Sequence, residues 1–418
     1  MNIYNSITVS GTKLAAGHNV QGFEITPIVT PNDDGIEIKG MLISLKALII
    51  SLRNEELNLK KLQIGNLVAK IPVIQGGMGV GISMSSLASS VANEGGIGVI
   101  AAAGIGMMRK TGKGLSLKES NIEALREEIR EARKNTGGIL GVNIMTALTD
   151  FSDMVKASIE EGIDIIFSGA GLPLNLPKFL DGSKRTKLVP IISSGRAAGL
   201  ITRRWIEKYN YAPDAFVVEG PKAGGHLGFK RNQIEKKEFS LETIVKEVIE
   251  KLKFFEKKYN KKIPVIAAGG IYEGSDIHKF LGLGAAGVQM GTRFVTTEEC
   301  DADIEFKNTY IDCKEEDVVI IDSPVGLPGR AIKNTFINAV GKGKKQPLKC
   351  PFHCIRSCNI TSSPYCIALA LTNAKNGKLQ NGFAFAGSNA YRADKIISVK
   401  ELFKNLADEY RAAVKRKK

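Results

Sequence analysis

The sequence predicts an α/β protein that folds as a (β/α)8 barrel, the TIM barrel. The chain has 418 residues, and from Ile71 onward short apolar runs alternate with amphipathic ones. Eight such apolar runs occur over residues 71–291, which is close to the roughly 250 residues that such barrels occupy. The alternative architecture, a doubly wound open sheet, prefers a G-x-G-x-x-G turn after its first strand. Gln75–Gly81 reads QGGMGVG, so the barrel is favoured.

The eight predicted strands are rich in Val, Ile and Ala, as strands of a parallel sheet buried on both faces are. They are Ile71–Gln75, Gly98–Ala102, Ile139–Asn143, Ile163–Ser168, Leu188–Ser193, Ala215–Glu219, Pro264–Ala268 and Ala286–Gly291. The amphipathic stretches between them carry apolar residues at helical spacing, so we expect helices that cover the barrel. The predicted helices are Ser85–Asn93, Asn121–Lys134, Phe151–Glu161, Arg196–Lys208, Leu241–Tyr259 and Ser275–Leu281.

Two segments lie outside the predicted barrel, which we place at residues 58–345. Residues 1–57 form an N-terminal extension with weak periodicity, to which the sequence assigns no role. Residues 346–418 form a C-terminal segment with a cysteine cluster and a closing amphipathic helix over Val399–Tyr410. After the eighth strand we also expect an apolar run at Val318–Ile321 and a helix through Arg330–Val340.

Composition and charge exclude several classes of protein. The formal net charge is +15, but the basic residues are spread along helices such as EALREEIREARK, and aromatic residues make up only 6%. We therefore expect no nucleic-acid partner, but a lysine-rich surface that attracts acidic substrates or carriers. The most apolar run, Met41–Leu52, is shorter than the ~18 residues of a membrane span and contains Lys46. We expect a cytoplasmic protein with a small-molecule substrate and no membrane contact, and a homodimer remains open.

The segment VVEGPKAGGHLGF, residues 217–229, is the most informative motif. A buried strand ends at Glu219, and a glycine-rich turn then brings a histidine, His226, to the edge of the barrel. Glycines such as Gly224 and Gly225 let the backbone approach a planar or phosphorylated ligand closely. Because barrel enzymes carry their chemistry at the carboxyl ends of the strands, His226 is a candidate acid or base.

Other predicted strands also end in small or polar residues. Gln75-Gly76-Gly77-Met78 follows the first strand, Asn143 closes the third, and Ser168–Gly171 follows the fourth. Gly269-Gly270 and Gln289–Thr292 stand at the ends of the last two strands, where these barrels commonly bind phosphate. Together the turns predict a pocket for a phosphorylated cofactor.

An ordered set of strings gives a specific resemblance over residues 59–340. PVIQGGMG, GVNIM, EGPKAGGHLG, IPVIAAGGI, GVQMGTRF and GRAIKN resemble the nitronate monooxygenases, formerly called 2-nitropropane dioxygenases. That family of FMN-dependent TIM-barrel flavoproteins also includes the flavin-dependent enoyl-ACP reductases. The resemblance implies an FMN cofactor held by Gly76, Gly77, Met78, Asn143, Glu219, Gly224, Gly225, Gly269, Gly270, Gln289, Met290, Gly291 and Thr292. Within this set, Gly76, Gly77 and Met78 line the flavin ring, and Gly269, Gly270, Gly291 and Thr292 hold the phosphate.

The resemblance implies that His226 is the catalytic residue. As a nitronate monooxygenase, the protein oxidises alkyl nitronates with O2 to carbonyl compounds and nitrite. As an NADH-dependent enoyl-ACP reductase, it reduces an enoyl thioester, and the shared motifs do not separate the two activities. Relatives often have Gln at the position of Glu219 and Glu at the position of Lys222, so this chain differs in pocket charge. A non-catalytic flavin- or metal-binding redox sensor is a third alternative.

The C-terminal cysteines depart from the family pattern. Cys350, Cys354, Cys358 and Cys366 form a C-x3-C-x3-C-x7-C pattern that includes His353, and on a helix the first three would share a face. We expect a metal site, either an iron–sulfur cluster or zinc, or else free or redox-active thiols. The glycine-rich stretch 381–392 is expected to fold over the flavin pocket. Arg330 is expected to meet an acidic substrate or to form a surface salt bridge.

Overall fold

The computed structural model describes residues 60–108, 115–183, 185–343, 350, 352–361 and 363–416, and the strand residues 31–32 and 35–36. Residues 1–58 form one unit and residues 59–418 a second, compact one. In the first unit, β1 (Pro31–Asn32) and β2 (Gly35–Ile36) pair as antiparallel strands. The apolar run at Met41–Leu52 lies outside the described residues.

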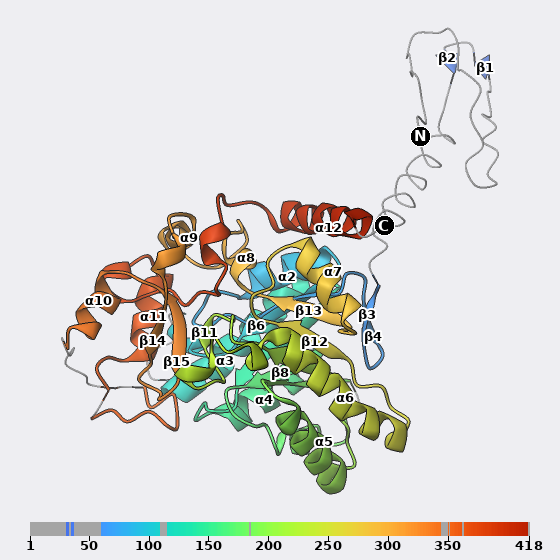
Figure 1. Cartoon of the computed structure of the whole chain (residues 1–418), viewed down its shortest axis with the longest axis horizontal. Coiled ribbons are helices and arrows are strands. Elements are labelled where there is room, and N and C mark those ends of the chain that lie inside the picture. Colours follow the sequence, from blue (N-terminus) through green and yellow to red (C-terminus); the bar gives the residue numbers. More distant parts are fainter. Residues whose placement is uncertain are drawn as a thin grey trace. The chain divides into compact units, whose positions relative to one another are not determined.

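Eight parallel strands close into a barrel (Figure 1), as the sequence predicts. In chain order they are β5 (Val73–Gln75), β6 (Ile97–Ala101), β7 (Ile139–Met145), β8 (Ile165–Gly169), β9 (Lys187–Ile192), β10 (Phe216–Glu219), β12 (Val265–Ala268) and β13 (Gly287–Met290). Closure is made by β13, which pairs with β5 through Gln289 and Ile74. Each predicted strand overlaps an observed one.

Helices cover the outside of the barrel between successive strands. They are α2 (Ser85–Asn93), α3 (Leu117–Asn135), α4 (Phe151–Glu160), α5 (Gly195–Tyr209), α6 (Leu241–Tyr259) and α7 (Gly274–Gly282). The hydroxyls of Ser116, Ser194 and Ser240 accept hydrogen bonds from first-turn amides of α3, α5 and α6, which stabilises those helix starts. Asn210 and Asn260 end α5 and α6 in left-handed conformations, a common way to stop a helix.

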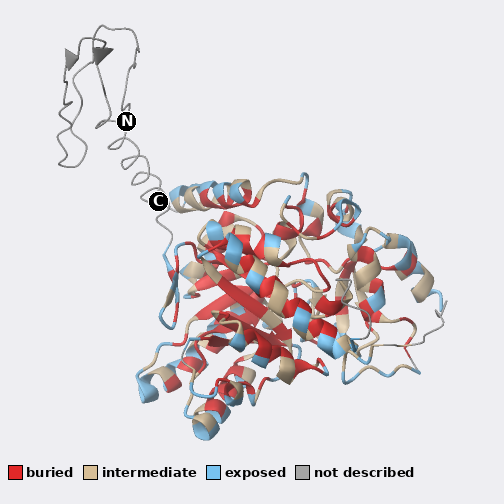
Figure 2. Cartoon of the chain, turned by 180° about the vertical axis from the view of Figure 1, so that it is seen from behind, coloured by how far each residue is buried: buried red, intermediate tan, exposed pale blue. Residues whose placement is uncertain are grey.

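The barrel interior is filled with apolar side chains, and its strands form the buried centre of the molecule (Figure 2). A hairpin that the sequence analysis did not predict adds to this core. It consists of β3 (Leu62–Ile64) and β4 (Leu67–Ala69) and inserts Leu62 and Ile64 among residues near the strand starts. The hairpin therefore covers the amino ends of the strands and leaves the carboxyl ends for a site.

A second, three-stranded sheet is attached to the barrel at the histidine motif. Its order is β11 (Gly225–His226), β15 (Pro328–Ile332) and β14 (Val318–Asp322), all antiparallel. The expectation of a helix through Arg330–Val340 is wrong for its first half. Arg330 pairs with Gly225 in the sheet, and the helix, α10, covers only Thr335–Gly341. Strand pairing with the distant β11 outweighs the local helical pattern.

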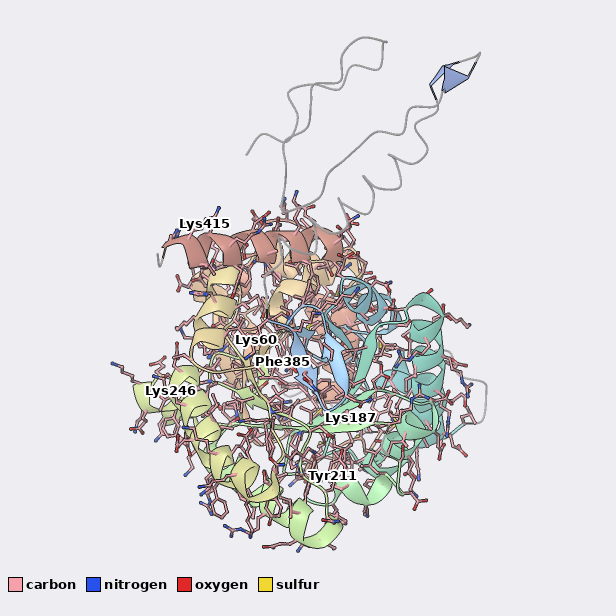
Figure 3. The ribbon with its side chains drawn as sticks, turned by 90° about the vertical axis from the view of Figure 1, so that its right-hand side faces the viewer. Lys60, Lys187, Tyr211, Lys246, Phe385 and Lys415 are labelled. Atoms are coloured by element: carbon pink, nitrogen blue, oxygen red, sulfur yellow. The ribbon has the colours of Figure 1, made fainter. Side chains whose placement is uncertain are left out.

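The chain after β13 builds a satellite core beside this sheet. This part of the chain forms α8 (Thr292–Val295), α9 (Ile304–Ile311), α10 and α11 (Ile367–Lys375), and the satellite core is built from α10, α11 and β15. Aromatic rings of Phe336, Tyr365 and Phe383 pack together there, with centroids 5.2 to 6.0 Å apart. Phe385 joins them from the following segment and lies within the fold, whereas Lys246 and Lys415 project from its surface helices (Figure 3).

The predicted closing helix is present and longer than expected, as α12 (Val399–Arg416). It packs against α7 (Figures 1 and 3). Glu409 of α12 accepts hydrogen bonds from Arg293 of α8 at 2.9 and 2.8 Å and from the Gly274 amide at 2.8 Å. This ion pair fixes α8, which begins directly after the strand-end turn at Gly291. No helix in the described parts of the chain is both long and apolar enough to cross a membrane.

Candidate functional site

A cavity of about 750 Å³ opens at the carboxyl ends of the barrel strands. Its size lies within the range typical of cofactor and small-molecule sites. The structure brings all the site residues predicted within the barrel to its wall. They are Gly76, Gly77, Met78, Asn143, Glu219, Gly224, Gly225, His226, Gly269, Gly270, Gln289, Met290, Gly291 and Thr292.

The strand-end turns come so close together that they require glycine. A Cβ added to Gly77 would lie 2.3 Å from Cβ of Asn143, and one added to Gly224 would lie 2.6 Å from the carbonyl carbon of Ala386. Gly269 and Gly270 adopt φ values of 94° and 83°, which side-chain-bearing residues rarely adopt. The barrel side of the cavity therefore presents bare backbone to a ligand.

His226 reaches the cavity from β11 and is held by two residues far along the chain. Its Nε2 lies 2.7 Å from Oγ of Ser323, and its ring packs edge-on against Phe385 with centroids 4.9 Å apart. Burial lowers the pKa of His226 from 6.5 to about 4. The imidazole is therefore neutral at physiological pH and has a nitrogen able to accept a proton.

Arg330 fastens the histidine loop rather than facing solvent. Its guanidinium donates hydrogen bonds to the carbonyl oxygens of Pro221, at 2.8 Å, and Ala223, at 3.2 Å. Both carbonyls belong to the turn between β10 and His226. The expected surface salt bridge is not what the structure shows. Arg330 instead positions the loop that carries the candidate base.

Glu219 is the last residue of β10 and lines the cavity, and the pKa of its carboxyl group is shifted. Within the described residues its carboxylate has no hydrogen-bond partner, and burial raises its pKa from 4.5 to about 7. A carboxyl group with that pKa is largely protonated below neutral pH and can then donate a hydrogen bond. The site thus combines a neutral imidazole with a titrating carboxyl group.

Residues 386–389 line the cavity beside the barrel turns, and they belong to the segment 381–392 that was expected to fold over the flavin pocket. The Gly387 amide donates to Oγ1 of Thr292 at 3.1 Å, and Asn389 Nδ2 donates to the Gly270 carbonyl at 2.8 Å. Nearby, the Ser388 amide donates to the Lys222 carbonyl at 3.1 Å, while Oγ of Ser388 is buried without a partner. An unpaired buried hydroxyl in a cavity wall is well suited to a ligand oxygen.

Ser323, Phe385 and Ser388 are site residues that the sequence analysis missed. Ser323 follows β14 and lies 97 positions from the histidine it contacts. Serine and phenylalanine in a loop carry no pattern that predicts such a distant contact. The glycine-rich composition of residues 381–392 was the only signal, and it indicated the segment rather than the side chains.

The four C-terminal cysteines and His353 line a second, much smaller pocket of about 20 Å³. All four are free thiols, and residues 352–361 form turns rather than the helix considered above. Burial, reinforced by the neighbouring cysteines, raises the pKa of Cys354 to about 12. In the described part of the chain, no three His, Cys, Asp or Glu side chains are arranged to hold a metal ion. The expected metal site, whether an iron–sulfur cluster or zinc, is therefore not shown by the described residues.

Comparisons with known proteins agree with this architecture. Residues 60–409 match the family model described as nitronate monooxygenase. A probable nitronate monooxygenase of Staphylococcus saprophyticus is 27% identical over 300 residues, covering 66% of this chain and 80% of that protein. A Mycobacterium tuberculosis protein named as a 5-hydroxy-7a-methyl-1-oxo-octahydro-1H-indene-4-carboxyl-CoA dehydrogenase is 26% identical over 274 residues, covering 66% of each.

Solved structures show the same relationship. FabK from Thermotoga maritima superimposes with a TM-score of 0.65 at 26% identity, covering 87% of this chain and 96% of that one. Nitroalkane oxidase from Streptomyces ansochromogenes shares the fold, with a TM-score of 0.64 at 22% identity over 84% of this chain and 98% of that one. The family match spans the barrel, the attached sheet and most of the closing helix. The chain belongs to the nitronate monooxygenase family, a family of flavin-dependent oxidoreductases.

Proposed function

We propose that this protein is an FMN-dependent nitronate monooxygenase that oxidises alkyl nitronates with O2 to carbonyl compounds and nitrite. The observation that carries the proposal is the placement of His226. It stands in the cavity wall, its Nε2 contacts Ser323, and its depressed pKa keeps the ring neutral. A neutral imidazole is suited to take the α-proton of a nitroalkane or to orient a nitronate.

The cavity residues fit FMN. The bare backbone at Gly76 and Gly77 suits a flat ring, and the left-handed Gly269 and Gly270 suit a phosphate held by amides. The unpaired Ser388 hydroxyl, next to Thr292 across the Gly387 amide, supplies a further donor for a phosphate oxygen. When bound, FMN supplies the electron transfer that no side chain provides.

Glu219 and His226 divide the proton handling in this proposal. Between pH values of about 4 and 7 the imidazole is neutral and the carboxyl group is protonated. His226 then accepts a proton, while Glu219 donates a hydrogen bond and adds no negative charge to the cavity. Apolar side chains line much of the cavity around both groups, and a surround of low polarity strengthens their electrostatic effect on a bound substrate.

A second candidate is an NADH-dependent reductase of an enoyl thioester. The likeness to FabK and to the indene-4-carboxyl-CoA dehydrogenase, whose name specifies a CoA-linked substrate, favours it. So does the cavity wall, which includes Phe229, Phe239 and the partly exposed Leu172 and Leu327, at 41% and 40% exposure. Such side chains suit an apolar acyl group. In this reaction His226 would deliver or share a proton rather than remove one.

Anaerobic flavin reduction, followed by absorbance, separates the two candidates. The purified protein is offered propionate 3-nitronate and NADH in separate cuvettes. Bleaching by the nitronate, with nitrite formed once air enters, supports the monooxygenase. Bleaching by NADH alone, reversed by an enoyl thioester, replaces it with the reductase. A protein that binds no flavin even after incubation with FMN contradicts both.

A further inference from the structure

The fold brings the four C-terminal cysteines together around one small pocket. Cys350, Cys354, Cys358 and Cys366 all line the same small pocket, whose other lining residues are His353 and three isoleucines. The remaining two cysteines, Cys300 and Cys313, are buried and line neither that pocket nor the larger cavity. The four thiols therefore form a cluster around the pocket, surrounded by apolar side chains, whereas Cys300 and Cys313 are separate buried residues.

This cluster is built on an irregular segment that is attached to the barrel. The Thr149 amide donates to the Cys354 carbonyl at 3.2 Å, and the Arg356 amide donates to the Ala147 carbonyl at 3.0 Å. These bonds attach the cluster to the loop that follows β7. Cys366 stands at the N-cap of α11. Residues 352–361 form turns apart from one isolated bridge, at Ile355, so few backbone bonds hold the thiols in place.

The thiol pocket shares a wall with the large cavity. Cys354, Ile355 and Ile367 line both. A group bound by the four cysteines would thus be separated from the cavity by single side chains. It would also fix the irregular segment that forms this part of the cavity wall.

We propose that Cys350, Cys354, Cys358 and Cys366 bind an iron–sulfur cluster beside the flavin cavity. Four thiolates are the usual ligand set of such clusters. A single zinc ion needs its four ligands about 2.3 Å from one point, and no described set of three ligating side chains is arranged for one ion. A cluster has several irons and bridging sulfides, so its cysteines stand further apart. The proposal goes beyond the proposed function and holds for either reaction.

The test is anaerobic reconstitution of the full chain with ferrous iron and sulfide, followed by desalting. Bound iron and acid-labile sulfide are measured per chain, together with zinc, visible absorption and the EPR spectrum after reduction. Wild-type protein is expected to hold iron and sulfide in equal amounts. Cys354→Ser and Cys366→Ser are expected to lose them, while the matched control Cys313→Ser, a buried cysteine outside the cluster, keeps them.

Three results would overturn the proposal. They are zinc without sulfide, iron that the Cys354→Ser variant retains in full, and a wild-type chain whose four thiols stay titratable and bind no iron. The wild-type measurement decides even if a variant folds poorly. Because FMN content and turnover are recorded on the same samples, a failure here is distinguishable from a failure of the proposed oxidoreductase activity.

Discussion

The two sides of the cavity are made by very different parts of the chain. The barrel side consists of short turns, each directly after a buried strand, that present glycine backbone. The other side is made mainly by residues beyond position 318, a part of the chain in which Ser323 and Phe385 contact His226. The comparison indicates that the barrel turns present backbone to the cavity, where we propose that FMN binds. The attached sheet and the segment after α11 set the chemistry of the histidine.

The largest expected effect comes from His226→Ala. Removing the candidate base is expected to lower turnover by about 10²–10⁴-fold, while bound FMN stays unchanged because the glycine turns remain. His278→Ala is the matched control, since His278 packs on Tyr410 with ring centroids 5.5 Å apart and lies outside the cavity. Steady-state kinetics and flavin absorbance measure both quantities. Normal turnover in His226→Ala would remove the assigned role.

Gly77→Ala and Gly224→Ala test the two sides separately. The added methyl of the first collides with Asn143 inside the barrel, and that of the second collides with the backbone at Ala386. Overpacking of this kind costs about 1–3 kcal/mol of stability. We expect Gly77→Ala to lose most of its FMN. Gly224→Ala is expected to displace the outer segment and lower turnover more than flavin content.

Gly137→Ala is the control for both glycine substitutions, since an added Cβ there meets nothing within 4 Å. Flavin content and melting temperature of the three variants give the comparison. If all three variants bind FMN equally well, the close approach of the strand-end turns has no role in holding the cofactor.

Arg330→Met probes the link between the two sides. It removes the hydrogen bonds to the Pro221 and Ala223 carbonyls, and hydrogen bonds from charged groups contribute about 1.5–3 kcal/mol each. We expect kcat to fall about tenfold, with the pH profile unchanged, because the histidine loop loosens. The control is Arg231→Met, whose partner Asp322 is 86% exposed, so little should change. A higher KM for acidic substrates at normal kcat would instead indicate direct substrate contact.

The same division explains what could be predicted from the sequence. The strand-end turns and His226 were found because strand, turn and chemistry are contiguous, and the barrel then brings their carboxyl ends to one face. Arg330 was placed in a helix because its partner, Gly225, lies 105 positions earlier and leaves no local mark. Ser323 and Ser388 were missed for the same reason. Contacts between distant segments depend on packing that single-residue patterns do not encode.

The smallest expected effect is on the pH dependence of kcat/KM. Each side of the cavity contributes one titrating group to it. Glu219 ends a barrel strand, and burial raises its pKa to about 7. His226 belongs to the attached sheet, and burial lowers its pKa to about 4. We expect kcat/KM to fall below pH ~4, as His226 gains a proton, and several-fold above pH ~7, as Glu219 loses one. Glu219→Gln should remove only the upper limb, because glutamine stays neutral.

The pH dependence of folding stability should report the ionisation of the Glu219 carboxyl group, independently of turnover. Its pKa is higher in the folded protein, about 7, than the ordinary 4.5, so the folded state binds the proton more tightly. The stabilisation that Glu219 contributes is therefore full below pH ~4.5 and lost as the pH rises through about 7. Melting temperatures across that window should decline less in Glu219→Gln than in wild type. Melting temperatures that decline equally in the two proteins, with the fall of kcat/KM above pH ~7 unchanged in Glu219→Gln, would contradict this prediction. Glu219 would then ionise normally, and only His226 of the attached sheet would have a shifted pKa in this cavity.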